Sequence, residues 1–478
     1  MPVEETHQLI AQRREKLKQM RASGINPFAN EFQPAETAQH VKAHFEEGRQ
    51  TRVAGRITAL RLMGKSIFCD LTDQTDRIQV YIQKQSLGDE QFEVIKHLDL
   101  GDIAGARGTL FTTKTGEKSV KVSEFVLLAK SLRPPPEKWH GLQDVETRYR
   151  QRYLDLMSNP EVRELFFKRS KIVSEIRRFL EGRGYIEVET PMMQAVPGGA
   201  AAKPFVTQHE ALGCPFYLRI ALELYLKRLL VGGFEKVFEM GRNFRNEGLS
   251  RKHNPEFTML EAYEAYGNFE SMMRLVEDLI RHVAQAVFGT LKVGGGRIDL
   301  GPEWERKRYK DLICNVTSPE WFGWPRAKKI EKARQLNLKP EPDWESHEIT
   351  NDVFEKIIEP GLIQPVFVTH LPKELVPLAK ASKDDPDVVD VFELCINGQE
   401  IAPGYSEQND PIEQRERLLH QAAGHEQKLD EDFLTALEHG MPPAGGIGIG
   451  IDRLVMMLTG ADSIRDVIFF PQLKPRED

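Results

Sequence analysis

Residues 237–266 constrain the fold of this chain more than any other stretch, because they hold two strand-like runs joined by a charged loop. Apolar and polar residues alternate in both runs, residues 237–244 and residues 257–266. An ionised glutamate is costly to bury unless a cation pairs with it, so a strand face that carries one is not ordinary core. One face of the second strand carries Phe257, Met259, Glu261, Tyr263 and Ala265.

The loop between these two runs is rich in charge. Such a cluster suits a polyanion, for example a nucleotide triphosphate. A solvated hairpin tip would also carry mixed charges, since charged loops are frequent on protein surfaces. The loop alone therefore leaves both interpretations open. The cluster consists of Arg245, Glu247, Arg251, Lys252 and His253.

The order of residues in this stretch is more specific than its charge. F-R-N-E, followed by a loop and an H-N-P-E-F-T strand, resembles the second signature motif of the class II aminoacyl-tRNA synthetases. The whole chain is similar to the lysyl-tRNA synthetase family of that class. The resemblance implies that Arg245 binds the ATP α-phosphate and the amino-acid carboxylate. It also implies that Glu247, His253 and Asn254 hold the nucleotide, and that Phe257 stacks on adenine.

Length and composition set the outer limits of the prediction. A chain of 478 residues should contain two or more domains. With a net charge of -7 the chain is not globally basic, so an RNA site would have to be a local patch. Four widely spaced cysteines without a C-x-x-C pair favour neither a disulfide framework nor a zinc site. Without a long apolar run or an apolar leader, we expect a cytoplasmic protein with no membrane partner.

The predicted secondary structure changes twice along the N-terminal part of the chain. Residues 4–23 read as an amphipathic helix whose basic face could touch RNA phosphates, although a solvated face explains it as well. This helix belongs to an N-terminal helical extension, residues 1–50. Residues 51–131 contain five short strand-like runs with a helical piece near residues 90–98, which predicts a five-stranded OB-fold β-barrel. The Pro-rich residues 132–144 form a semi-rigid linker.

Phe68 and Gln79 stand out within the predicted barrel. A surface phenylalanine offers a face on which an unstacked base can lie, and glutamine can read the polar edge of that base. Their spacing resembles the anticodon-binding domain of the lysyl, aspartyl and asparaginyl enzymes, which implies an anticodon-binding role. The competing interpretation is that Phe68 belongs to the barrel core.

The rest of the chain, residues 145–478, is predicted to be the catalytic domain, an antiparallel sheet flanked by helices with a helical insertion over about residues 317–348. Residues 269–288 are predicted to form a long helix, because their apolar residues recur in helical register, and the methionines in it belong to the core. Another long amphipathic helix, over residues 162–180, is followed by the strand-like Y-I-E-V-E-T-P, residues 185–191. As bare sequence this unit is ordinary core. It resembles the first class II motif, which implies a homodimer.

Two further segments complete the predicted nucleotide site. G-G-I-G-I-G-I-D-R-L-V-M, residues 445–456, has neither the G-K-[ST] of a Walker loop nor a dinucleotide fingerprint. It resembles the third class II motif, which implies that Arg453 clamps the γ-phosphate and the adenine. Glu393 and Glu400 lie on strand-like sequence, and carboxylates gathered near a triphosphate suggest Mg²⁺. The resemblance implies that these two glutamates are the magnesium ligands.

The amino-acid site follows from the same resemblance. It implies that Gly199 and Glu223 bind the α-ammonium group of lysine, although a glutamate in a first helical turn also meets the helix dipole favourably. It implies that Glu407, with Glu261 and Tyr263, surrounds the side-chain ammonium. Two buried carboxylates require a cation, so a neutral or acidic amino acid would leave them unpaired at a cost of several kcal/mol.

Two other positions complete the expected lysine contacts. Tyr405 should pack along the methylene groups of the substrate. Members of the family often carry Asn where this chain has Pro403, and proline cannot supply the side-chain hydrogen bonds of asparagine. The charge argument for lysine does not depend on that position.

The resemblance implies an α+β enzyme that joins L-lysine to ATP, releases pyrophosphate and transfers lysine to the 3′ end of tRNA(Lys). No protein nucleophile is needed, and no Ser/His/Asp or Cys/His set demands one. One rival is a lysyl-adenylate enzyme that modifies a protein, but such relatives usually lack the barrel. The other rival is an RNA-binding relative without catalysis, which the presence of Arg245, Glu393, Glu400 and Arg453 disfavours.

Overall fold

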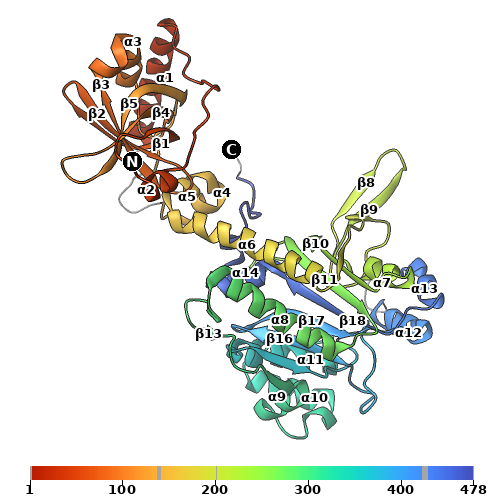
Figure 1. Cartoon of the computed structure of the whole chain (residues 1–478). Coiled ribbons are helices and arrows are strands. Elements are labelled where there is room, and N and C mark those ends of the chain that lie inside the picture. The colour runs from red at the N-terminus through yellow and green to blue at the C-terminus, as the bar shows by residue number, and fades with distance from the viewer. Residues whose placement is uncertain (1–2, 137–141, 201, 423–428, 477–478) are drawn as a thin grey trace. The chain divides into compact units, whose positions relative to one another are not determined.

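The computed structural model describes residues 3–136, 142–200, 202–422 and 429–476 (Figure 1). The chain divides into two compact units, Met1–Asn159 and Pro160–Asp478. Each unit has its own apolar core. The predicted linker over residues 132–144 includes residues 137–141, which lie outside the described residues.

A closed barrel forms the centre of the first unit, with the strands in the order β1-β2-β3-β5-β4. This confirms the predicted five-stranded OB fold. A helix follows the third strand, as predicted, but it begins earlier than expected, and Gly88 with a φ of 79° interrupts it. The elements are β1 (Gln50–Met63), β2 (Ser66–Thr72), β3 (Arg77–Gln83), α3 (Lys84–Lys96), β4 (Ile103–Thr112) and β5 (Lys118–Ala129).

Helix α1 (Val3–Ala22) is the predicted N-terminal helix. Part of its basic face contacts the same unit: Arg13 Nη1 donates to the carbonyl of Ser131 at 3.0 Å, and Lys16 Nζ lies 2.6 Å from Asp99 Oδ1. These two cations therefore help to hold the helix in place. The first unit also contains α2 (Ala38–Ala43), α4 (Val145–Arg150) and α5 (Arg152–Ser158).

An eight-stranded sheet runs through the second unit in the order β14-β15-β16-β17-β18-β11-β10-β6. From β15 to β10 every pairing is antiparallel, as predicted. The two outermost pairs are parallel. The strands are β6 (Ile186–Glu187), β10 (Lys236–Phe244), β11 (Glu256–Ala265), β14 (Glu305–Arg308), β15 (Val366–Thr369), β16 (Val391–Ile396), β17 (Gln399–Ser406) and β18 (Ala444–Gly450).

The strand expected over residues 185–191 is much shorter than the sequence suggests. Only β6 pairs with β10, and the amide of Val188 adds one bond to the carbonyl of Phe238. The chain then leaves the sheet edge, because the amide of Thr190 donates instead to the Glu239 carboxylate at 3.1 Å.

Two long helices pack against this sheet (Figure 1). Both α6 (Pro160–Gly182) and α8 (Phe269–Phe288) follow the predicted apolar periodicity. Met272 and Met273 of α8 are buried in the core with residues of the sheet, as expected. Asn268 caps α8: its side chain accepts from the amide of Ser271, whose hydroxyl accepts from the amide of Asn268.

Shorter elements surround the sheet. A three-stranded sheet consists of β7 (Met193–Gln194), β8 (Val206–His209) and β9 (Cys214–Leu218), and a hairpin consists of β12 (Lys292–Val293) and β13 (Ile298–Asp299). The region of the predicted insertion packs around the buried Trp321. The remaining helices are α7 (Glu223–Val231), α9 (Tyr309–Val316), α10 (Arg326–Gln335), α11 (Ser346–Val353), α12 (Pro411–Ala422), α13 (Glu431–Glu438), α14 (Ile451–Thr459) and α15 (Ile464–Val467). Across the described ranges, no helix has both the length and the apolarity to span a membrane.

Candidate active site

A buried carboxylate and a buried phenol lie side by side on β11. The hydroxyl of Tyr263 donates to Glu261 Oε2 at 2.9 Å, and the amide of Leu222 donates to Glu261 Oε1 at 3.1 Å. Both side chains are buried. Burial raises the pKa of Glu261 to about 7, and the nearby charge of Glu223 adds to this effect. The strand alternation read from the sequence thus places an acid inside the protein without an ion-pair partner in the described structure.

A second acid, Glu407, lies at the end of β17 and is only 1% exposed. Its Oε2 is 2.5 Å from the ammonium of Lys227, which is also 2.7 Å from Oε1 of Glu223. Burial raises the pKa of Glu407 to about 8, although the ammonium of Lys227 lowers it. The oxygen Oε1 of Glu407 makes no hydrogen bond in the described structure. Glu223 and Glu407 thus share one resident ammonium, and the charge of the nearby Glu261 acts on Glu407.

Glycines lie against this group of acids, which we call the acidic pocket. A Cβ at Gly446 would lie 2.0 Å from Glu407 Oε1 and 2.6 Å from the ring of Tyr263, so any side chain there would displace these two groups. Gly199 has a φ of 85°, and a Cβ there would lie 3.4 Å from the Cβ of Glu223. Tyr405 closes another side, with its ring centroid 5.6 Å from the ammonium of Lys227. The structure therefore brings together the six residues predicted to bind lysine.

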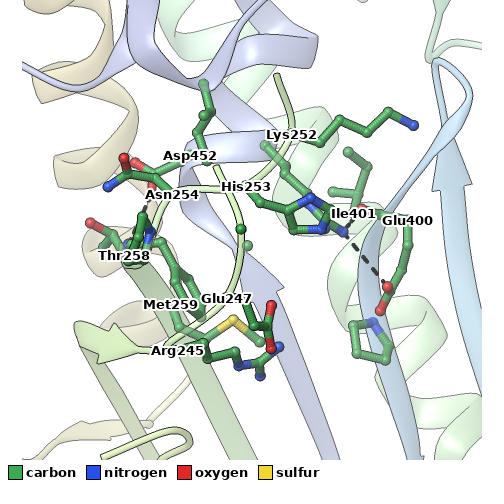
Figure 2. A pocket seen from close by; sticks show the side chains of 17 residues that line it. Arg245, Glu247, Lys252, His253, Asn254, Thr258, Met259, Glu400, Ile401 and Asp452 are labelled. Carbon is green, nitrogen blue, oxygen red and sulfur yellow. Dashed lines mark hydrogen bonds and ion pairs between the residues drawn. The ribbon is translucent and has the colours of Figure 1, made fainter. Parts of the chain in front are cut away.

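A polar cavity lies beside the acidic pocket (Figure 2). A Cβ at Gly448 would meet Met259 of this cavity at 2.7 Å and Glu261 of the acidic pocket at 3.8 Å, so the two spaces share a wall. Figure 2 shows Glu400 on β17 facing the loop that carries His253. The predicted nucleotide-binding residues that line this cavity are Arg245, Glu247, His253, Asn254, Phe257, Glu400 and Arg453.

Two arginines dominate the charge of this cavity. The guanidinium carbon of Arg245 lies 5.2 Å from the ring centroid of Phe257, a cation–π contact. Arg453 donates to the carbonyl of Glu400 at 3.1 Å and lies 3.7 Å from its carboxylate. Arg453 Nη2 also lies 3.1 Å from Nε2 of His253. Burial and the charge of Arg453 lower the pKa of His253, so its imidazole is neutral at pH 7.

Glu393 lies on β16, the strand that pairs with β17. Its pKa is raised well above the usual value by burial and by the negative charges of Glu400, Glu359 and Glu355. The sequence singled out Glu393 and Glu400, but not the two glutamates that flank them from residues 354–361. No group of three or more His, Cys, Asp or Glu side chains among the described residues has metal-binding geometry of its own. Two neighbouring carboxylates nevertheless suit Mg²⁺, which takes further ligands from phosphate and water.

The sequence did not single out several residues that shape the site. Asp452 accepts from the amide of Thr258 at 2.8 Å and pairs with Arg169 at 2.6 Å, which ties α14 to β11 and α6. Lys227 was overlooked because one lysine in the helix E-L-Y-L-K-R-L carries no signal of burial. Only the fold brings Glu407 to that lysine.

The two residues singled out in the barrel share one face of β2 and β3. The register pairs Phe68 with Tyr81 and Asp70 with Gln79, while their sequence neighbours point into the core. Phe68 is half-buried, lies outside that core and stacks on Tyr81 with ring centroids 4.7 Å apart. Gln79 is buried, and its carbonyl accepts from the hydroxyl of Ser119 at 2.9 Å. The core interpretation of Phe68 is therefore wrong, whereas anticodon binding stays a prediction.

Comparison with known proteins identifies the family. Residues 144–474 match the class II tRNA synthetases (D, K and N), and residues 51–128 match the OB-fold nucleic acid binding domain. The chain is 52% identical to the lysine–tRNA ligase of Pelotomaculum thermopropionicum, over 99% of this chain and 96% of that protein. It is 51% identical to the enzyme of the same name from Carboxydothermus hydrogenoformans over the full length of both, and 48% identical to that of Bacillus subtilis, over 99% and 98%. The chain belongs to the class II tRNA synthetases, in the lysine–tRNA ligase family.

Proposed function

We propose that this chain is a lysine–tRNA ligase, which couples L-lysine to tRNA(Lys) with ATP as the energy source. One observation carries the proposal: three buried carboxylates surround a pocket in which, within the described structure, Lys227 is the cation that pairs with Glu223 and Glu407. An amino acid with two ammonium groups compensates the remaining negative charge. Neutral and acidic amino acids leave it uncompensated.

In this proposal the α-ammonium group of lysine binds Glu223 beside Gly199. The side-chain ammonium reaches Glu407 and Glu261, and the unpaired Oε1 of Glu407 accepts from it. The hydroxyl of Tyr263 orients Glu261 by its hydrogen bond. Tyr405 packs along the methylene groups. Pro403 lines the adjoining cavity and supplies no polar group to lysine.

The neighbouring cavity takes ATP. Phe257 stacks on the adenine, and Glu247, His253 and Asn254 contact the nucleotide. Arg453 holds the γ-phosphate end. Because the neighbouring His253 is neutral, it adds no second positive charge beside the Arg453 guanidinium.

Arg245 lies between the two halves of the site. It lines the nucleotide cavity, and the charge of Glu261 acts on it from the acidic pocket. We assign Arg245 to the α-phosphate and to the lysine carboxylate, which brings the two reacting groups together. Arg245 and Arg453 are thus the catalytic residues, because they neutralise the charge that develops on the phosphates.

Glu393 and Glu400 would hold the Mg²⁺ that members of this family generally use with ATP. Their mutual repulsion, which contributes to the raised pKa of Glu393, favours a cation between them. The ion would supply charge neutralisation to the triphosphate.

The chemistry needs positioning more than reactive protein groups. The lysine carboxylate attacks the α-phosphorus in line, the bond to the β-phosphate oxygen breaks, and pyrophosphate leaves. The 3′-hydroxyl of the tRNA then attacks the lysyl carbonyl and AMP leaves. In well-oriented systems, holding two reactants in line lowers the activation barrier by about 7 to 11 kcal/mol.

The decisive test is amino-acid-dependent ATP–pyrophosphate exchange, measured with each of the twenty amino acids and without tRNA. Exchange with lysine, at a KM well below that of any other amino acid, is the expected result. Exchange with a different amino acid alone would overturn the assignment of the acidic pocket. Silence with all twenty would favour an RNA-binding relative without catalysis.

We further propose that the barrel binds the anticodon of tRNA(Lys), with Phe68 stacking on a base and Gln79 reading its edge. The supporting observation is the half-exposed aromatic pair of Phe68 and Tyr81 on the barrel surface. Single-stranded RNA is read by such aromatic faces together with polar side chains. A chain with this role acts in the cytoplasm, where tRNA is charged.

The second unit is also proposed to form a homodimer through the region of α6 and β6. Large apolar side chains are exposed on α6 and β6, namely Phe167 and Ile186, and on β7, namely Met193. Such side chains in one region mark association surfaces. Sedimentation equilibrium should give twice the chain mass, and Ile186→Glu together with Met193→Glu should give the monomer mass. A monomeric parent protein would contradict this proposal.

A further inference from the structure

The acidic pocket already contains an ammonium group that belongs to the protein. Lys227 is fully buried, and its Nζ lies 2.7 Å from Glu223 Oε1 and 2.5 Å from Glu407 Oε2. It also lies 3.5 Å from the carbonyl of Leu378 and 5.6 Å from the ring centroid of Tyr405. Lys227 therefore joins the start of α7 to the end of β17.

This position is unusual for a lysine. Fully buried lysines are rare unless they are paired, because removing an ammonium from water is costly. Here the two partners are both carboxylates that the proposed function assigns to substrate. The charges of Glu223 and Glu407 raise the pKa of Lys227 and offset the effect of its burial. The ammonium is thus charged in the empty protein.

We propose that Lys227 is a specificity-determining positioning residue, a resident counter-ion that favours the ionised form of Glu407 and holds Glu223 and Glu407 in place for the two ammonium groups of lysine. The proposal rests on the proposed function and deepens it. Lys227 acts through the two glutamates and leaves Glu407 Oε1 free for substrate.

The charge balance explains why one resident cation is needed. Glu223, Glu261 and Glu407 carry three negative charges when ionised, and Lys227 compensates one of them. The two charges that remain equal the two ammonium groups of lysine, while the lysine carboxylate faces Arg245. Without Lys227, three carboxylates would face two ammonium groups, and one carboxylate would take up a proton.

A purely structural role is the competing explanation. Glu223 and Lys227 are one turn apart on α7, and an i,i+4 pair of this kind also supports a helix. The two roles differ in their dependence on pH. A lost structural contact weakens lysine binding at every pH, whereas a lost counter-ion moves the pH at which Glu407 ionises. The other titratable groups that face these carboxylates are Glu261 and Tyr263 from β11 and Tyr405 from β17.

The experiment compares full-length wild type with Lys227→Met, which keeps an unbranched apolar chain and removes the charge. KM for lysine, KM for ATP and kcat of pyrophosphate exchange are measured from pH 6.5 to pH 9.5. We expect the lysine KM of Lys227→Met at pH 7 to rise about tenfold or more, because each pKa unit changes the ionised fraction tenfold. At pH 9.5 the difference should shrink, and KM for ATP should stay within about twofold of wild type.

Two further variants separate charge from hydrogen bonding and from general effects. Lys227→Gln can still donate to both glutamates but carries no charge, so it should show the same shift to higher pH. Lys227→Gln also provides the test of the counter-ion role if Lys227→Met does not fold. Lys236→Met removes a lysine that pairs with Glu264 on the edge of the same sheet, and it should leave the lysine KM unchanged.

The outcomes are distinct. A lysine KM that rises equally at all pH values in Lys227→Met, or a wild-type pH profile in Lys227→Gln, would overturn the counter-ion role while the proposed function stands. Absence of lysine-dependent exchange in the wild-type protein would overturn both. A shift of the lysine KM profile to higher pH in the two neutral variants, with Lys236→Met unchanged, would support the inference.

Discussion

Glu407 shows how a single carboxylate can define a substrate. It is buried, one of its oxygens is taken by Lys227, and the other points toward the space beside Gly446. A buried oxygen without a hydrogen-bond donor destabilises the empty protein, and a donor that arrives with the substrate removes that cost. The free energy gained when lysine donates to this oxygen therefore contributes to lysine binding.

Replacing Glu407 with Gln tests this directly. The neutral amide cannot compensate the side-chain ammonium, and losing one partner of a buried charge pair costs about 2 to 5 kcal/mol. KM for lysine in pyrophosphate exchange should therefore rise about 100-fold, while KM for ATP stays near the wild-type value. Glu413→Gln, which removes a surface partner of Arg417, is the matched control. Equal losses for lysine and ATP would remove Glu407 from the ammonium site.

The pH dependence of lysine binding gives an independent check on the wild-type protein. Burial raises the pKa of Glu261 to about 7 and of Glu407 to about 8, so both bind protons in the empty protein at pH 6. Lysine must displace these protons, and its affinity should rise with pH until both groups are ionised. Calorimetric titration should give a Kd about tenfold weaker at pH 7 than at pH 8. A Kd that does not change over this range would contradict the raised pKa values.

The residues of the pocket differ in how far sequence could predict them. Glu261 and Tyr263 could be predicted together, because strand alternation places both on one face. Lys227 could not, because its neighbour Arg228 in the same helix has the same local sequence signal and pairs with Asp430 near the surface. Burial of the first cation and partial exposure of the second depend on the partners that the fold brings to them, Glu407 for Lys227 and Asp430 for Arg228.

At the scale of elements, the boundaries of helices rest on local chemistry. The apolar periodicity of α8 predicted its full length, and Asn268 and Ser271 fix its first turn by reciprocal hydrogen bonds. The length of the edge strand β6 was overestimated, because the alternation of apolar and polar residues within 185–191 does not indicate where the chain leaves the sheet. Local signals therefore predicted capped helices better than the ends of edge strands.

Asn268→Ala should destabilise the second unit without affecting its chemistry. Loss of a capping side chain typically costs about 1 kcal/mol. Urea unfolding followed by far-UV circular dichroism should show a lower midpoint, with the lysine and ATP KM values unchanged at 25 °C. Asn268→Asp keeps a good cap and should unfold near the wild-type midpoint. An unchanged midpoint for Asn268→Ala would mean that α8 is held by its core packing alone.

At the scale of the whole molecule, the chain consists of two units with separate cores and separate chemistry. The sequence predicted a boundary at the Pro-rich residues 132–144, whereas the structure divides the chain after Asn159, so that α4 and α5 belong to the first unit. The barrel presents aromatic side chains on its surface, whereas the second unit gathers buried acids and arginines. We therefore expect mutations in each unit to affect different steps of the reaction.

Phe68→Ala should separate these steps. Stacking of a base on an aromatic ring is worth about 1 to 3 kcal/mol, so KM for tRNA in aminoacylation should rise about tenfold. Pyrophosphate exchange without tRNA should keep its wild-type rate, because it needs only the second unit. Phe28→Ala removes another exposed phenylalanine of the first unit and serves as the control. A loss of exchange activity in Phe68→Ala would contradict the division of labour.

The glycines of β18 have a consequence for attempts to redesign the substrate of this protein. At Gly446 and Gly448 the wall of the pocket is bare backbone, so no side chain there can be trimmed to admit a larger amino acid. A single methyl group would collide with Glu407 and Tyr263 at Gly446, or with Met259 at Gly448, so neither position accepts a side chain unless these groups move. Selection for a different amino acid must therefore work on the side chains of the neighbouring strands, at Tyr263 or Tyr405, which pair with Gly446.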